Sequence, residues 1–260
     1  MGPWRTAWHR LKRDRWSLAA LIVLCVLVVT SAAGGPVVSK LVGHSGEDIF
    51  PYATGVNFKP VGPWTRVPAV HAARTDIYGG TLPPPRHVKK TLLVFGGDGV
   101  LGRDEFIRVL DGGRASLEIG LLAALVSLVL AVPIGAVAGY FGGWIDAVVS
   151  RVTETAMAFP LLLFLVFASV HLGSLVRDIG VGNVVPRGVI GEAILIGLFT
   201  AFYPLRLVRA QLLTLKKAEF VEATEMVGSS DFRILRRHLL PHLVPTMLVW
   251  GAIAVGTNIL

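Results

Sequence analysis

Residues 117–140 read LEIGLLAALVSLVLAVPIGAVAGY, an apolar run whose one acidic residue, Glu118, lies at its start. A helix needs roughly 20 mostly apolar residues to cross the hydrocarbon core of a bilayer. Pro133 lies inside the run, where packing against neighbouring helices can compensate for the lost backbone hydrogen bond. The stretch therefore predicts a membrane-spanning helix, and it sets the class of the fold.

The composition of the chain agrees with a membrane protein. Of its 260 residues, 53% are hydrophobic and 16% charged, whereas soluble domains carry about 25% charged residues. The formal charge of +8 would suggest a nucleic-acid partner in a soluble protein. In a membrane protein, basic residues flank the spans and set their orientation, so we expect no nucleic-acid partner. The single cysteine, Cys25, excludes a disulfide within the chain.

Four further apolar runs predict spans at residues 17–33, 155–172, 189–208 and 243–260. The first follows a basic head, as in a signal peptide, but its length favours an uncleaved anchor. We therefore expect an all-α polytopic membrane protein with five spans. The expected segments are a cytoplasmic N-terminus (1–16), a first helix (17–34), an external segment (35–115) and a membrane core (116–260) that contains a cytoplasmic stretch (209–242).

Basic residues indicate which connections face the cytoplasm. The stretch 209–242 carries two lysines and four arginines, which fits the excess of positive charge in cytoplasmic loops. Residues 141–154 would also be cytoplasmic, and 173–188 external. The external segment 35–115 is basic too, but long translocated loops escape the charge rule. We expect it to be irregular, with two short strands.

The external segment contains a GxGxxG pattern at Gly97, Gly99 and Gly102, between an apolar run and an expected helix. This order is typical of dinucleotide-binding folds. Such a fold needs several strand–helix–strand units, and about 80 residues cannot supply them. We therefore interpret the pattern as a glycine-rich turn that leads into a helix on the outer membrane surface. Arg103, Arg108 and Arg114 would lie at the lipid headgroups.

The cytoplasmic stretch includes FVEATEMVGSSDFRILRRHLLP at residues 220–241. The pattern predicts a short helix over 217–227 that Gly228 ends as a C-cap. A turn at 229–231 would cap a second, amphipathic helix, which would be broken at Pro241. The alternative is an ordinary amphipathic loop on the lipid headgroups.

This stretch resembles the EAA motif of bacterial ABC importer permeases, which reads E-A-A, three residues, G, nine residues, I, one residue, L-P. The spacing fits throughout, with Thr224 in place of the second alanine and His238 in place of isoleucine. The matching positions are Glu222, Ala223, Thr224, Gly228, Leu240 and Pro241. The sequence RHLLP is similar to the RHILP variant of the dipeptide and oligopeptide branch, which also transports nickel complexes.

Further stretches resemble signatures of the same branch. Residues 96–104 resemble its external G-T-D-x-L-G-R-D, with Gly97 where threonine is usual and one extra residue before Leu101 unless the register starts at Gly97. The other signature positions are Asp98, Gly102, Arg103 and Asp104. Residues 112–117 resemble G-x-R-x-S-L, residues 138–146 resemble G-Y-x-G-G-W-x-D, and 158–160 match A-F-P. The resemblance covers about 96–260 and the first span, and residues 36–90 match nothing in it.

The resemblance implies a type I ABC importer permease in a bacterial inner membrane, with a cytoplasmic N-terminus and no catalysis of its own. The helix around Glu222 and Gly228 would be the coupling helix. Two separate cytoplasmic ATPase subunits would bind the ATP and Mg²⁺, so we expect no cofactor in this chain. The other expected partners are a second, homologous permease, an external solute-binding protein and the bilayer. The solute would be a peptide or a similar small molecule.

Ionisable groups at spans are candidates for the solute path, here Glu118, His171 and Glu192, although all three lie toward predicted span ends. Arg206 and Arg209 are expected to anchor the inner interface. The family usually has six spans, and five are visible before Leu260, so a last span is expected to be missing. The alternative functions are therefore a truncated or non-transporting relative of such a permease, or a membrane-anchored enzyme that uses the external segment.

Overall fold

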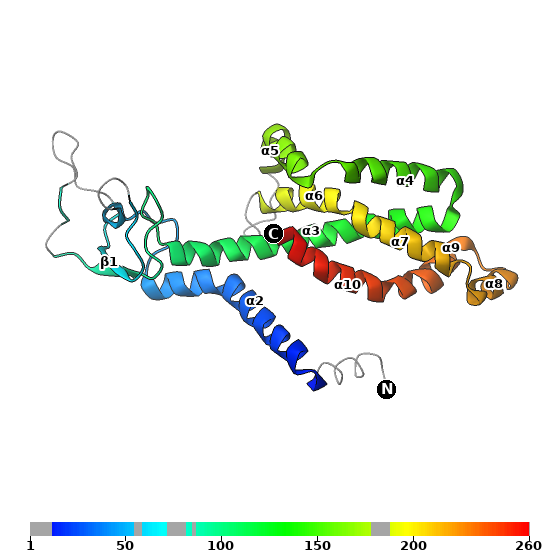
Figure 1. Cartoon of the computed structure of the whole chain (residues 1–260), viewed down its shortest axis with the longest axis horizontal. Helices are drawn as coiled ribbons and strands as arrows, with labels where there is room; N and C mark the ends of the chain where they lie inside the picture. Colours follow the sequence, from blue (N-terminus) through cyan, green and yellow to red (C-terminus); the bar gives the residue numbers. More distant parts are fainter. Residues whose placement is uncertain (1–11, 55–58, 72–81, 85–86, 178–187, 260) are drawn as a thin grey trace. The chain divides into compact units, whose positions relative to one another are not determined.

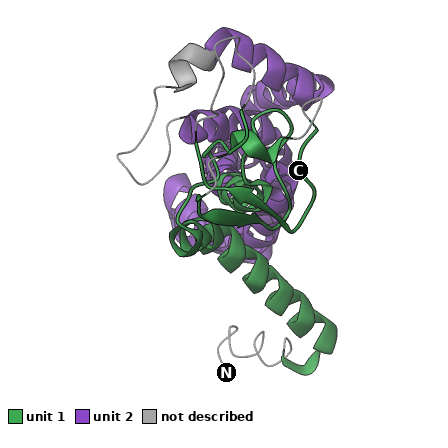
Figure 2. Cartoon of the chain, turned by 90° about the vertical axis from the view of Figure 1, so that its left-hand side faces the viewer, with its two compact units in different colours: residues 1–117 green, residues 118–260 purple. Residues whose placement is uncertain are grey.

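The computed structural model of the chain describes residues 12–54, 59–71, 82–84, 87–177 and 188–259. Its elements are α2 (Arg15–Val42), η1 (Pro51–Ala53), β1 (Thr65–Pro68), β2 (Lys90–Leu93), α3 (Glu105–Phe141), α4 (Gly143–Ala158), α5 (Leu161–Arg177), α6 (Val189–Thr200), α7 (Phe202–Leu215), α8 (Glu219–Met226), α9 (Asp231–Ile234), the π-helical turn η3 (Leu235–Leu239) and α10 (Leu240–Ile259) (Figure 1). The chain divides into two compact units, residues 1–117 and 118–260 (Figure 2). Most of the predicted basic head and of the predicted external loop 173–188 lies outside the described residues.

Among the residues that the structure describes, three helices are long and apolar enough to cross a membrane: Arg15–Val42, Glu105–Phe141 and the continuous Asp231–Ile259. Two bent helix pairs bring the number to five if each pair is one span. The all-α membrane class that the sequence predicts is therefore confirmed. The predicted spans at 155–172 and 189–208 are wrong in detail, because each crosses a sharp bend between two helices.

The bend between α4 and α5 measures 88° and that between α6 and α7 measures 42°. The first has a local cause in Pro160, since the residue before a proline is disfavoured in the helical conformation. Phe159 accordingly adopts φ −81° and ψ 133°, which is extended. Most of the stretch 141–154, which the sequence predicts to be cytoplasmic, forms α4.

The first unit contains the two short strands expected in the external segment. β1 and β2 pair antiparallel, from Thr65 opposite Leu93 to Pro68 opposite Lys90. Phe50, Ala53, Val67 and Leu93 form its buried apolar cluster. α2 also lies against the first turns of α3, where a side chain at Gly35 would clash with Asp111 and one at Gly113 would touch Ser31.

α3 contradicts the expected surface helix after the glycine-rich turn. It begins at Glu105 and continues without interruption to Phe141. Arg108 and Arg114, which were expected at the headgroups, therefore lie in the first turns of the helix that also forms the predicted span at 117–140. Pro133 does not break α3, as expected for a proline in a packed span.

The second unit is held together by close helix packing at glycines. A Cβ added at Gly135 would lie 2.7 Å from the carbonyl oxygen of Leu205, and one at Gly139 would lie 2.8 Å from that of Arg209, both on α7. Gly197 of α6 approaches the carbonyl of Ala123 on α3 equally closely. Small residues at such contacts let membrane helices pack backbone to backbone. The same unit buries an apolar cluster of Ala136, Val208, Leu212, Val221, Ile234, Leu235, Leu239, Leu243 and Met247.

Candidate functional site

The short helix α8 projects from the second unit but is fixed to its core. Its Val221 is 1% exposed and belongs to the apolar cluster that contains Val208, Leu212 and Ile234. Phe220 stacks on the ring of His242, with centroids 5.3 Å apart. Three residues, 216–218, join α8 to the end of α7. A displacement of α8 must therefore move α7 with it.

The opposite face of α8 is open. Glu219, Glu222, Ala223 and Met226 are exposed, and their spacing of three and four residues puts them on one face. Two carboxylates thus flank a small residue, next to a methionine that is 85% exposed. Thr224, which replaces an alanine of the motif, is partly buried, and its hydroxyl donates to the carbonyl of Phe220 at 2.6 Å. The replacement therefore leaves the exposed face unchanged.

Gly228 ends α8 as the sequence predicts. It has φ +81°, a left-handed conformation in which glycine carries no Cβ penalty. The N–H of Gly228 donates to the carbonyl of Glu225 at 2.8 Å, and that of Ser229 to the carbonyl of Thr224 at 3.3 Å. Ser230 holds the N-cap position of α9 without a side-chain capping bond. The turn leaves Val227 86% exposed, beside the open face of α8.

The predicted break at Pro241 is wrong. Pro241 is the second residue of α10, and the helix from Asp231 runs through it to Ile259. The π-helical turn η3 lies directly before it, and the N–H of Leu240 donates to the carbonyl of Leu235, five residues back. The wider turn gives room to the proline ring, which would collide with the preceding turn of a regular α-helix. Leu240 is half-buried and Pro241 exposed.

Two polar contacts brace this part of the second unit. The hydroxyl of Tyr140, at the end of α3, donates to Asp231 at 2.8 Å. Arg209 of α7 makes a two-pronged ion pair with Asp146 of α4. Its Nε donates to Oδ1 of Asp146, and its Nη2 donates to Oδ2 at 2.7 Å. A paired, two-pronged guanidinium–carboxylate contact fixes orientation as well as distance. The sequence analysis placed Asp146 and Tyr140 in a family signature and predicted no contact for either.

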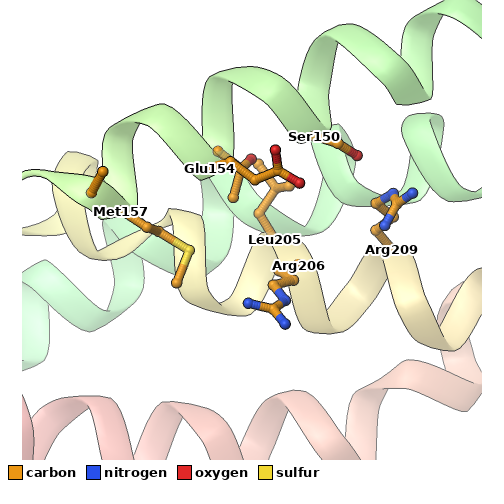
Figure 3. Close-up of a pocket in the computed structure, with 8 residues that line it drawn as sticks. Ser150, Glu154, Met157, Leu205, Arg206 and Arg209 are labelled. Atoms are coloured by element: carbon orange, nitrogen blue, oxygen red, sulfur yellow. The ribbon is translucent and has the colours of Figure 1, made fainter.

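A cavity of about 500 Å³ lies between α4 and α7 (Figure 3). It is lined by Ser150, Thr153, Glu154, Met157, Ala158, Leu205, Arg206 and Arg209. Arg206 and Arg209 were expected at the inner membrane interface, and the structure brings both to this cavity. The sequence carried no signal for it, because its two walls lie on helices that are far apart in the chain.

In the glycine-rich loop of the first unit, the side chain of Asp98 makes hydrogen bonds within the loop. The carboxylate of Asp98 accepts hydrogen bonds from the backbone N–H of Arg103 at 2.9 Å and from its Nε at 2.8 Å, and it also pairs with Arg108. Burial raises the pKa of Asp98, but these bonds and charges outweigh it and hold the pKa below its usual value. Arg103 also binds Glu47 at 2.9 Å. Two of the arginines expected at the headgroups, Arg103 and Arg108, are thus paired within the unit.

Asp104, the last residue of the external signature, is buried and joins three elements. Its carboxylate lies 3.0 Å from Nε2 of His44, just after α2, and accepts from the backbone N–H of Phe106 at 3.0 Å in the first turn of α3. The other ring nitrogen of His44 lies 3.4 Å from the hydroxyl of Thr91 in β2. Gly97 pairs with Asp104 as an isolated β-bridge. The signature residues therefore tie the first unit together.

The remaining candidates are scattered. His171 bonds the carbonyl of Phe167 in its own helix at 3.0 Å, and Glu192 lies exposed in the first turn of α6. In the described parts of the chain, histidine, cysteine and carboxylate side chains form no group of three that could hold a metal ion. The strands there form one two-stranded antiparallel sheet, which differs from the parallel sheet of a dinucleotide-binding fold.

Comparison with known proteins places these features in a family. Residues 131–260 match the binding-protein-dependent transport system inner membrane component family, and residues 2–55 match the N-terminal TM domain of oligopeptide transport permease C. The chain is 28% identical over 259 residues to a glutathione transport system permease protein of Pectobacterium atrosepticum, covering 99% of this chain and 70% of that protein. It is 29% identical to the corresponding Escherichia coli strain 536 protein, covering 99% and 69%. A dipeptide transport system permease protein of Bacillus subtilis is 30% identical, with 97% and 64% covered.

Proposed function

The chain belongs to the family of binding-protein-dependent transport system inner membrane components, and from this premise we propose that it is the permease subunit of an ATP-driven importer of peptides or similar small solutes. The relatives named for glutathione and dipeptide transport support this substrate class. Selection among such solutes would rest with an external solute-binding protein. A second, homologous permease would complete the path through the inner membrane.

One observation carries the mechanism: α8 is open on one face and anchored in the core on the other. The exposed Glu222 and Ala223 suit docking in a cleft of a cytoplasmic ATPase subunit, because the small side chain of Ala223 allows close approach. Glu222 would accept hydrogen bonds or pair with a basic group there. ATP and Mg²⁺ would be bound and hydrolysed by two such subunits. This chain would supply no catalytic residue and would bind no cofactor.

The anchored face converts docking into movement of the spans. Val221 packs on Val208 and Leu212 of α7 and on Ile234 of α9. A rigid-body movement of the ATPase would therefore displace the spans on both sides of α8, as expected for hinge and shear transitions. The N-terminus would be cytoplasmic, because the basic residues before α2 and those around α8 obey the positive-inside rule with the same orientation.

A tagged pull-down from mild detergent tests the docking face. Glu222→Arg reverses a charge on the open face of α8. Glu225→Arg makes the same change at an exposed position four residues from the buried Val221, outside the set of Glu219, Glu222, Ala223 and Met226 that forms the open face. We expect ATPase subunits to co-purify with the wild type and with Glu225→Arg but to be lost with Glu222→Arg. Equal retention in both variants would overturn α8 as the joint. Absence of any ATPase from the wild type would overturn the proposed subunit composition.

A further inference from the structure

The cavity between α4 and α7 lies beside both helix breaks. Ala158 is the last residue of α4, directly before the 88° bend, and Leu205 follows the 42° bend by one turn. Interrupted helices in transporters are typical neighbours of solute sites, because the break leaves room and polar backbone groups inside the membrane region. The volume of about 500 Å³ falls in the range of sites that hold small molecules.

The lining carries charge of both signs that the protein only partly neutralises. Arg209 is paired with Asp146. In the part of the chain that the structure describes, Arg206 makes no ion pair, and the buried Oγ of Ser150 has no hydrogen-bond partner. Glu154 touches Arg151 at 3.2 Å, but both side chains are largely exposed, so this pair is weak and easily exchanged.

The cavity is also mechanically connected to α8. One of its walls is α7, which supplies Leu205, Arg206 and Arg209. Val208 and Leu212 of the same helix belong to the apolar cluster that contains Val221 of α8. A movement of α8 would therefore reach the helix that carries Arg206 and Arg209, and Figure 3 shows labelled side chains of α4 and α7 that line the cavity.

From these observations we propose that the cavity is a transit subsite for a zwitterionic solute with a free carboxylate, such as a short peptide. Arg206 binds the carboxylate, and Glu154 attracts the ammonium group. Arg206 is exposed on the wall of the cavity and is available to a ligand, and a planar guanidinium suits carboxylate better than any other cation does. The proposal rests on the proposed import of peptides, and it names where in this chain they pass.

Cysteine accessibility in membranes that contain the assembled transporter tests the subsite. The chain has a single cysteine, so Cys25→Ala gives a thiol-free background. Met157→Cys places a thiol in the cavity wall, and Val152→Cys places one on the exposed side of the same helix. The probes are an anionic sulfonatoethyl and a cationic trimethylammonium-ethyl methanethiosulfonate, whose rates are compared at each position.

The field of Arg206 should favour the anionic reagent in the cavity. We expect Met157→Cys to react about tenfold faster with the anionic than with the cationic reagent, as for charge-lined clefts. Arg206→Gln should bring the ratio close to that of Val152→Cys. Alanyl-alanine should protect Met157→Cys and not Val152→Cys, and alanyl-alanine amide should protect less.

The subsite is overturned if the dipeptide does not protect Met157→Cys, or if Arg206→Gln leaves both the rate ratio and the protection intact. A thiol at 157 that is unreactive in the assembly, with normal dipeptide uptake by Arg206→Gln, would mean that a partner subunit fills the cavity, and this also overturns it. Uptake of labelled alanyl-alanine by wild-type membranes is measured separately. Absence of this uptake contradicts the proposed function. Protection of Met157→Cys by the dipeptide requires binding alone, so it tests the subsite separately.

Discussion

Tyr140 and Asp231 are 91 residues apart in the sequence, and the hydroxyl of one donates a 2.8 Å hydrogen bond to the carboxylate of the other. The bond joins the end of α3 to the first residue of α9 and so closes the turn that follows α8. Nζ of Lys216 lies 3.4 Å from the backbone carbonyl of Tyr140 and adds a contact from the other end of α8. α3 is thus braced against both flanks of the proposed coupling helix.

Tyr140→Phe tests this brace, because it removes the hydroxyl and keeps the ring that packs edge-on against Phe141. We expect a loss of about 1 kcal/mol in the free energy of unfolding, the usual worth of one hydrogen bond. Solute uptake per ATP hydrolysed should fall, since α8 loses a fixed support. Thermal unfolding in detergent and the uptake-to-hydrolysis ratio in vesicles measure the two effects. Tyr203→Phe, on the exposed side of α7, is the control and should change neither.

Asp98→Asn should alter how the first unit responds to acid. The folded-state pKa of Asp98 lies below its unfolded value, mainly because bonds from Arg103 outweigh the opposing effect of burial. A lowered pKa stabilises the fold above the unfolded value, about 3.9, and this stability is lost as the pH falls through the folded pKa. The variant should therefore be less stable at pH 7 and lose less stability between about pH 4 and pH 2.

Thermal unfolding of purified protein across this pH range measures the difference between Asp98→Asn and wild type. Glu105→Gln is a matched control, because its carboxylate reaches Arg108 only at 3.8 Å and is partly exposed. It should follow the wild-type acid profile closely. Parallel profiles for Asp98→Asn and wild type would contradict a structural role for the Asp98 bonds.

Local patterns in the sequence were enough for the class of fold and for α8 with Gly228, because both depend on contiguous residues: an apolar run, or a short helix followed by a left-handed glycine. The course of the chain through Pro241 was not predictable in this way. It depends on the π-helical turn before the proline and on burial of Leu235 and Leu239 in the apolar cluster. A rule based on proline alone takes neither the turn nor the burial into account.

The polar contacts within each of the two units could not be predicted from the sequence, for a related reason. His44 and Asp104 are 60 residues apart and Asp146 and Arg209 are 63 apart. Each residue alone is compatible with solvent, headgroups or a partner chain. Only the pairing of α2 with α3, and of α4 with α7, brings them into contact. The family signatures marked three of these four residues as members of motifs or interface anchors without indicating what they touch.

His44→Ala should destabilise the first unit. The ring of His44 is buried between Asp104, Thr91 and Phe50, so its removal leaves a buried carboxylate with one bond fewer and a cavity beside Phe50. A buried polar group that loses its partner costs about 1–3 kcal/mol. Limited proteolysis of the external segment and thermal unfolding should both show the loss. His87→Ala, at an exposed position, should behave as wild type.

Gly139→Ala should weaken the contact of α3 with α7. The added Cβ would lie 2.8 Å from the carbonyl oxygen of Arg209 and 2.9 Å from Cβ of Leu212, and backbone cannot move aside as a flexible side chain can. Overpacking of this kind costs about 1–3 kcal/mol. Because the shift would reach Arg209 at the cavity and Leu212 in the apolar cluster of Val221, uptake should fall together with stability.

Gly112→Ala is the control, because it adds the same methyl group to the same helix where nothing lies within 4 Å. It should keep uptake unchanged and raise stability slightly, since alanine is the better helix former. If both variants unfold at the wild-type temperature, the helices of the second unit are not packed as closely as Gly139 and Arg209 require.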